Sequence, residues 1–226
     1  MRSIILALFL AAACGKSSGQ PATERTSGSG TASGSGTDVL LCDGKTKVTI
    51  PGNTPPTRAS GQQVSDALMA QWKQQNPGGA WEEDVRRSHA HAIKPPADNR
   101  AVFTGAQRDA QTYGQYTEVD LLTWERETLR AVYEGARVFH SGEELGSTIG
   151  VSCDMCHPDA ANTHPETYPK FQPQMGRVVL LRDMINWCIE HPLRGTAFAA
   201  DDRRMRALET YIYAQRSGTP LTYGKH

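Results

Sequence analysis

Two cysteines one helical turn apart and followed by a histidine, Cys153-Asp154-Met155-Cys156-His157, constrain this chain more than any other feature. C-x-x-C-H is the attachment pattern for c-type haem, in which both thiols add to the vinyl groups of the porphyrin. The fixed geometry then presents the imidazole of His157 to the iron as its proximal ligand. The sequence therefore predicts one covalent haem c, with Cys153 and Cys156 as attachment sites and His157 as metal ligand.

Two other kinds of site use a pair of cysteines at this spacing. A zinc site needs two further ligands at metal-like spacing, and the downstream candidates are Cys188, His164 and His191. The sequence contains no second C-x-x-C and no H-x-x-x-H. A thioredoxin-like redox pair follows a strand in a βαβ unit, and the flanking sequence shows no such alternation. Haem is thus the first interpretation and zinc the second.

The first 14 residues are typical of an export signal. Met1-Arg2-Ser3 is a basic start, and residues 4–13 form a short apolar core that ends in small residues. This stretch is too short to cross a bilayer. The alanines before Cys14 resemble the lipobox of bacterial lipoproteins, although the usual leucine three residues before the cysteine is absent. We therefore expect a lipoprotein signal peptide and lipidation of Cys14, with plain signal cleavage as the alternative.

Residues 15–38 are mostly Gly, Ser, Thr and Ala without apolar periodicity, a composition typical of a disordered tether. The chain has 24 basic and 24 acidic side chains, so its charge indicates neither nucleic-acid binding nor a polybasic membrane patch. We expect an exported protein, in the periplasm or at the cell surface, held to a bacterial membrane by its lipid anchor.

Apolar residues recur at helical spacing in the C-terminal part of the chain. Helices are predicted from Thr123 to His140, from Val178 to Ile189, and in a third segment that starts at Asp201 or Asp202 and ends before Gly218. In the first helix, Gly135 and Phe139 form a G-x-x-x-F pair that resembles class I cytochromes c, where the glycine allows a close crossing by the C-terminal helix. We expect a mainly α fold, with a class I-like cytochrome c domain at 123–226.

Residues 39–122 are predicted to form an irregular N-terminal extension with two ordered elements. The stretch from Val39 to Ile50 alternates around Asp43-Gly44, a favoured turn, and predicts a hairpin. Gln62 to Gln75 has apolar residues on one face and predicts a helix that packs on the haem domain.

Four segments carry a family resemblance: Tyr168 to Phe171, Leu180 to Cys188, Met205 to Ile212 and Ser217 to Pro220. Together they look like the haem domain of thiosulfate dehydrogenases. They are also similar to the catalytic cytochrome subunit of the Sox sulfur-oxidation system. The Ile-Asn-x-Cys element that ends at Cys188 is the most specific part, because it is not a general feature of cytochromes.

In that family the cysteine of this element is the distal haem ligand, so the resemblance implies that Cys188 binds the iron opposite His157. A thiolate stabilises ferric iron, whereas a thioether raises the potential. Met175 is the alternative ligand, with Met184 and His191 behind it. Because Cys42 is the remaining cysteine in an oxidising compartment, a Cys42–Cys188 disulfide is also expected by default. Both roles of Cys188 stay open.

Two departures from the family favour electron transfer over sulfur chemistry. The family usually has an arginine one helical turn before the cysteine, where this chain has Met184. Thiosulfate dehydrogenases typically carry a second haem domain, because joining two thiosulfates releases two electrons and a single haem stores one. We therefore expect a monohaem cytochrome that passes single electrons to a redox protein partner, rather than a self-sufficient oxidoreductase. The alternatives are a sulfur-oxyanion oxidoreductase with Cys188 as catalytic residue, and a haem subunit that docks a catalytic partner.

Overall fold

The structure of the protein, a computed structural model, describes residues 36–89 and 117–225. The predicted signal peptide with Cys14 and residues 15–35 of the predicted tether lie outside the described residues. Residues 90–116 of the predicted extension also lie outside them. The described residues are mainly α-helical and include two short antiparallel sheets. The prediction of a mainly α fold is confirmed.

A hairpin stands at the start of the described chain. Strand β1 (Thr37–Leu40) pairs antiparallel with β2 (Lys47–Ile50), with Val39 opposite Val48. The hairpin prediction is confirmed, although the connection is longer than the two-residue turn expected. The carboxylate of Asp43 accepts hydrogen bonds from two backbone N–H groups of this connection, both at 2.9 Å, and so closes it as an Asx-type turn.

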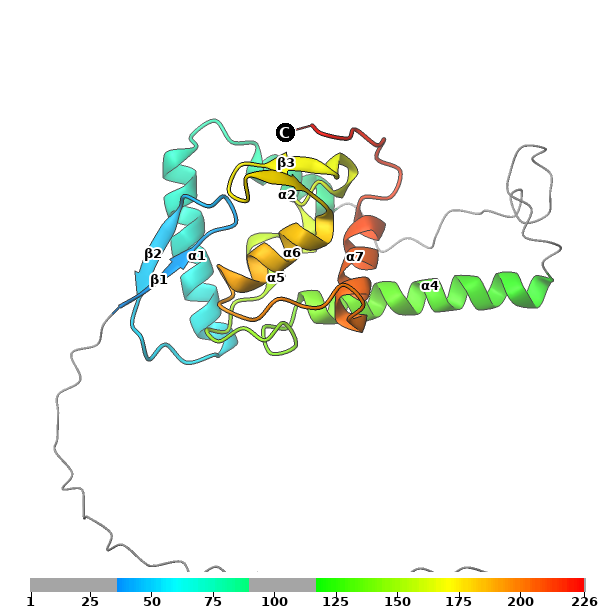
Figure 1. Cartoon of the computed structure of the whole chain (residues 1–226), viewed down its shortest axis with the longest axis horizontal. Coiled ribbons are helices and arrows are strands. Elements are labelled where there is room, and N and C mark those ends of the chain that lie inside the picture. The colour runs from blue at the N-terminus through cyan, green and yellow to red at the C-terminus, as the bar shows by residue number, and fades with distance from the viewer. Residues whose placement is uncertain (1–35, 90–116, 226) are drawn as a thin grey trace, which may run out of the picture. The chain divides into compact units, whose positions relative to one another are not determined.

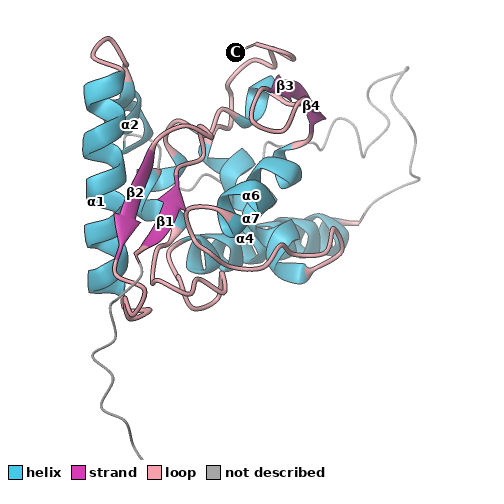
Figure 2. Cartoon of the chain, turned by 60° about the vertical axis from the view of Figure 1, so that its left-hand side comes forward, coloured by secondary structure: helices cyan, strands magenta, loops and turns pink. Residues whose placement is uncertain are grey.

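Two helices follow the hairpin. Helix α1 (Arg58–Gln75) lies beside the hairpin in both views (Figure 1 and Figure 2). It begins before the predicted Gln62, because the side chain of Thr57 accepts a hydrogen bond from the N–H of Ser60 and caps the first turn. Helix α2 (Trp81–His89) has acidic residues in its first turn, where negative charge favours a helix N-terminus.

Helix α4 (Glu118–Phe139) is the long helix whose N-terminal half extends away from the other elements in Figure 1. It begins before the predicted Thr123, because Thr117 and Asp120 form a capping box around the first turn. Its C-terminal half is packed into the core. The buried residues of this half are Val132, Gly135, Val138 and Phe139.

Helix α7 (Arg203–Gln215) crosses the C-terminal half of α4 (Figure 1). The side chain of Asp202, one of the two residues at which the sequence predicted the helix to start, accepts a hydrogen bond from the N–H of Arg204 and caps α7. The two helices approach closely at Gly135, where a Cβ atom would overlap the backbone carbonyl of Ala207. The close crossing predicted from the G-x-x-x-F pair is confirmed.

Short elements connect α4 to α7. The predicted helix from Val178 begins later than expected, as α6 (Leu181–Glu190), because Val178 belongs to a strand and the N–H of Leu180 donates to the carboxylate of Asp183. Strands β3 (Lys170–Gln172) and β4 (Arg177–Val179) pair antiparallel. The connecting elements are α5 (Cys153–Cys156), the 3-10 turns η1 (Pro158–Ala160) and η2 (Pro165–Thr167), β3 (Lys170–Gln172), β4 (Arg177–Val179) and α6 (Leu181–Glu190).

One core joins the extension to the C-terminal part. Val39 and Leu68 from the extension are fully buried in the same apolar cluster as Val132 and Leu208 of the crossing helices. The predicted packing of the α1 segment on the C-terminal part is confirmed by its contacts with α5. In the described ranges, none of the helices is both long and apolar enough to cross a bilayer.

Candidate haem site

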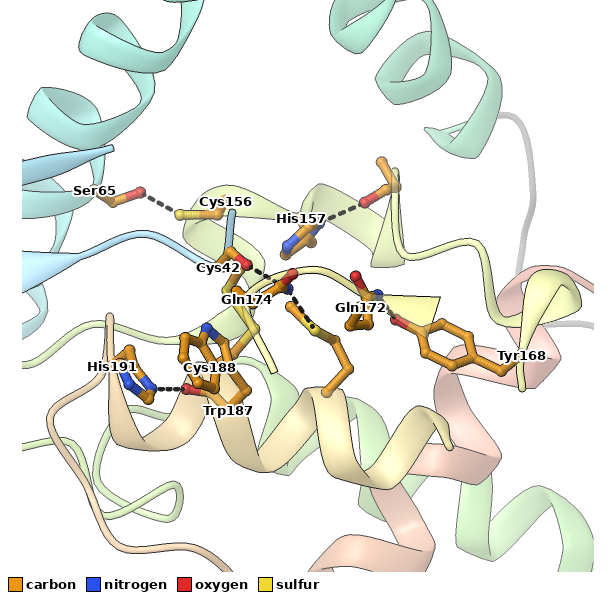
Figure 3. The surroundings of a disulfide bond; sticks show 12 residues. Cys42, Ser65, Cys156, His157, Tyr168, Gln172, Gln174, Trp187, Cys188 and His191 are labelled. Atoms are coloured by element: carbon orange, nitrogen blue, oxygen red, sulfur yellow. Dashed lines mark hydrogen bonds between the residues drawn. A yellow bond between two sulfur atoms is a disulfide. The ribbon is translucent and has the colours of Figure 1, made fainter. Parts of the chain in front are cut away.

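A cavity of about 400 Å³ brings the C-x-x-C-H motif together with α6 and α7. Figure 3 shows Cys156 and His157 on one side and Cys188 on α6 across from them. Much of the wall between these sides is apolar, which suits the flat apolar body of a porphyrin. Its apolar residues include Phe139, Val151, Leu181, Ile185, Leu193, Leu208 and Ile212.

The ring of His157 is held by one hydrogen bond, between its Nδ1 and the backbone carbonyl of Ala161 at 2.8 Å. Because a carbonyl can only accept, Nδ1 carries the proton, and Nε2 is left with a free lone pair. Burial lowers the pKa of His157, so the ring stays neutral at physiological pH. A neutral imidazole with one nitrogen oriented by a carbonyl is the usual state of a metal-binding histidine.

Both cysteines of the motif are free thiols. Burial raises the pKa of Cys153 to about 12 and that of Cys156 to about 11, so neither is a thiolate at neutral pH. The hydroxyl of Ser65 on α1 lies 3.1 Å from the sulfur of Cys156. The residues fit a c-type haem, because two free thiols and an imidazole with an open nitrogen line one cavity.

Helix α1 also makes contacts that hold the start of α5. The guanidinium of Arg58 donates to the carboxylate of Asp154 at 2.7 Å and to the carbonyl of His140 at 3.0 Å. Gly61 lies directly on the backbone of Gly150, where a Cβ atom would overlap the Gly150 carbonyl. The extension therefore supports the helix that carries both cysteines of the C-x-x-C-H motif.

The candidate distal ligands lie in different places. Cys188 lines the cavity and is joined to Cys42 in a disulfide with 5.4 Å between the two Cα atoms. Met184 also lines the cavity, and its sulfur accepts a hydrogen bond from Gln174 at 3.5 Å. Met175 packs against the core but does not line the cavity.

His191, the remaining candidate, does not line the cavity. Its ring stacks on that of Trp187 at 3.6 Å between centroids. Its Nδ1 also donates to the carbonyl of Trp187 at 2.8 Å (Figure 3). The structure therefore brings Cys188 and Met184, but not Met175 or His191, to the cavity that His157 lines.

Residues 134–221 match the model of one protein family, the SoxA/TsdA cytochrome c domain. This segment is a SoxA/TsdA-type cytochrome c domain. No curated protein matches the chain. The match confirms the resemblance expected from the Ile-Asn-x-Cys element and its neighbours. A cytochrome c domain implies a covalently bound haem c and redox partners in electron transfer.

The SoxA/TsdA-type domain accounts for only part of the site. Cys42, Ser65 and Trp81 come from the extension, outside the matched segment, and sequence reasoning assigned only Cys42 a role there. Trp81 lies against the ring of His157, with 5.3 Å between ring centroids. No local pattern marks these residues, because their partners are distant in the sequence.

Two lysines add positive charge to the wall of the cavity, and sequence reasoning also missed them. Lys170 and Gln172 share one face of β3 and both line the cavity, whereas Phe171 between them is exposed. Successive side chains of a strand point to opposite faces, so this alternation could have predicted that Lys170 and Gln172 lie on the same side. Burial lowers the pKa of Lys170, whose ammonium lies 4.8 Å above the ring of Tyr168. Lys45, in the hairpin connection, lines the same cavity.

Proposed function

We propose that this protein is an exported monohaem c-type cytochrome that passes single electrons between redox proteins. One observation carries the proposal: both free thiols of the C-x-x-C-H motif and the open Nε2 of His157 line one largely apolar cavity in a SoxA/TsdA-type domain. The sequence contains a single C-x-x-C-H, which supports one haem per chain.

In this proposal the chain's own side chains hold and tune the cofactor. Cys153 and Cys156 attach it, and His157 binds the iron through Nε2. Lys45 and Lys170 offer positive charge for its two propionates. When bound, haem c supplies a centre that gains or loses one electron. The apolar wall excludes water from that centre, which strengthens the electrostatic effect of each polar group near it.

For the sixth iron position we propose Cys188, in the state in which it is not bonded to Cys42. The thiolate is the form of cysteine that binds metals, and a disulfide sulfur carries no such charge. Met184 lines the same wall and is the proposed ligand while the disulfide is closed. Met175, which sequence reasoning ranked second, does not line the cavity and has less support.

The proposal of export rests on the sequence. SoxA/TsdA-type cytochromes are generally exported. The apolar segment before Cys14 and the Gly/Ser-rich stretch after it support a lipid-anchored protein at a bacterial membrane. Mass spectrometry of the mature N-terminus tests the anchor: a diacylated Cys14 is expected, and a cleaved, unmodified N-terminus contradicts it.

The experiment that tests the haem proposal is co-expression with a c-type haem maturation system, followed by pyridine haemochrome assay. We expect one covalent haem per chain. Cys153→Ala and Cys156→Ala should each attach haem through a single thioether and give a lower yield of haem-loaded protein. Met155→Ala, a control change between the two cysteines, should attach haem as the native chain does. A chain that matures without covalent haem contradicts the proposal.

A second candidate function is oxidation of thiosulfate or a related sulfur oxyanion. The placement of Cys188 on the cavity wall across from His157, in an Ile-Asn-x-Cys element, favours it. Thiosulfate-dependent haem reduction, measured with the Cys42–Cys188 pair reduced, is expected to be lost in Cys188→Ala and retained in Met175→Ala. Absence of reduction in the native chain leaves electron transfer as the function.

A further inference from the structure

The loop after the haem motif has an unusual backbone. Asp159, Ala160, Asn162 and His164 have φ angles of 49°, 58°, 58° and 44°. This left-handed region disfavours residues with a Cβ atom, and it persists only where surrounding contacts fix it. The residues outside the loop that hold it are therefore part of the site.

This loop controls the ring of His157. The carbonyl that accepts the hydrogen bond from Nδ1 belongs to Ala161, between two of the left-handed residues. A shift of that carbonyl would weaken the hydrogen bond and release the ring. The position of Ala161 thus sets the tautomer, the orientation and the electron density of the imidazole.

Asp84 on α2 is the contact that fixes the next residue of the loop. Its Oδ2 accepts a hydrogen bond from the backbone N–H of Asn162 at 2.6 Å. The side-chain amide of Asn162 in turn donates to the carbonyl of Trp81 at 3.4 Å. The Trp81 ring contacts the rings of both Trp72 and His157, at centroid distances of 5.1 Å and 5.3 Å.

The carboxylate of Asp84 is buried and charged. The residue is 3% exposed, and the guanidinium of Arg216 lies 3.3 Å from its Oδ1. Burial by itself raises the pKa of Asp84, but the hydrogen bond from Asn162 and the charge of Arg216 outweigh it and hold the pKa below its ordinary value. The bond to Asn162 is therefore charge-assisted, and such bonds are the strong ones.

We infer that Asp84 is a positioning residue for the proximal ligand. By fixing Asn162 it fixes the neighbouring Ala161 carbonyl, and through that carbonyl it keeps electron density on the ring of His157. The inference rests on the proposed function, since it concerns the imidazole that would bind the iron. It also means that α2, which lies outside the matched family segment, contributes a positioning residue to the site.

The test uses the haem-loaded full chain with Asp84→Ala, Asp84→Asn and Glu83→Ala. Glu83 is an exposed acid beside Asp84 on α2 and serves as the matched control. The readouts are covalent haem per chain, reduction potential, and the paramagnetically shifted proton resonance of the His157 ring N–H.

Asp84→Ala should retain covalent haem but shift the potential to more positive values and move the His157 resonance. The reason is that a weaker N–H···O bond leaves less electron density on the ring to stabilise ferric iron. Asp84→Asn keeps an acceptor without the charge, so we expect a smaller shift in the same direction. Glu83→Ala should match the native chain.

An unchanged potential and resonance in folded Asp84→Ala would overturn the inference. If Asp84→Ala does not fold, Asp84→Asn takes its place in the test. A reduction potential and a His157 resonance equal to those of the native chain in Asp84→Asn would then reject the positioning role of Asp84. Failure of the native chain to attach haem is a different result, because it rejects the proposed function itself.

Discussion

Cys188 is bonded to Cys42 in the wall of the cavity that His157 also lines. The two cysteines are 146 positions apart, so the bond ties the hairpin connection of the extension to α6 of the SoxA/TsdA-type domain. One sulfur atom cannot be both a disulfide partner and a thiolate ligand. The two roles that the sequence left open for Cys188 therefore exclude each other.

Opening this disulfide should change the ligand set of the haem-loaded protein. We expect Cys42→Ser, or the native chain treated with dithiothreitol, to develop the visible and electron-paramagnetic-resonance spectra of low-spin thiolate-ligated ferric haem. Cys188→Ala should show no such signal with or without dithiothreitol. A thiolate spectrum that persists in Cys188→Ala would exclude this cysteine as the distal ligand.

The same disulfide should also stabilise the fold, because it closes a very long loop in the unfolded chain. Removing it in the double variant Cys42→Ala/Cys188→Ala is expected to lower the free energy of unfolding by about 4 kcal/mol. Urea unfolding of the haem-loaded proteins under oxidising conditions measures the loss. Equal stability of the native chain and the double variant would contradict the prediction.

Gly135→Ala tests the crossing of α4 and α7. The added methyl group overlaps the carbonyl of Ala207, so the helices must separate, which outweighs the higher helix propensity of alanine. We expect a loss of about 2 kcal/mol in the free energy of unfolding. Gly78→Ala is the control, since a Cβ atom there meets no neighbour, and it should change stability by no more than about 0.5 kcal/mol.

The buried group formed by Asp84, Glu166 and Arg216 predicts acid sensitivity. Burial alone raises the pKa of both carboxyls. For Asp84, the hydrogen bond from Asn162 and the charge of Arg216 hold the pKa below its ordinary value of 3.8. For Glu166, hydrogen bonds from His164 and Arg216 help to hold the pKa below its ordinary value of 4.5.

Because the pKa values are lower in the folded state, their stabilisation is present above the ordinary values and is lost as pH falls through the folded ones. Asp84→Asn/Glu166→Gln should therefore flatten the dependence of unfolding free energy on pH below about pH 5. Chemical unfolding at a series of pH values measures the slope. Glu83→Gln should keep the native slope, and an equally steep slope in the double variant would refute the assignment.

Local patterns predicted much of the fold. The hairpin, the helix of the extension and the three helices of the C-terminal part all formed, and each overlaps the segment predicted from its apolar pattern. The starts of α1, α4 and α6 were misplaced, because the capping contacts of Thr57, Thr117 and Asp183 decide them and apolar periodicity does not report caps.

The sequence by itself determined which residues are proposed to attach the haem, because Cys153, Cys156 and His157 stand at C-x-x-C-H spacing. It also determined the domain type, because the elements of the SoxA/TsdA-type domain are contiguous from 134 to 221. Only the tertiary structure decided that Cys188 and Met184, not Met175, reach the cavity, that Cys42 is bonded to Cys188, and that Asp84 contacts the loop after the haem motif. These are contacts between segments far apart in the chain, and they arise from packing, which leaves no signal in a local pattern.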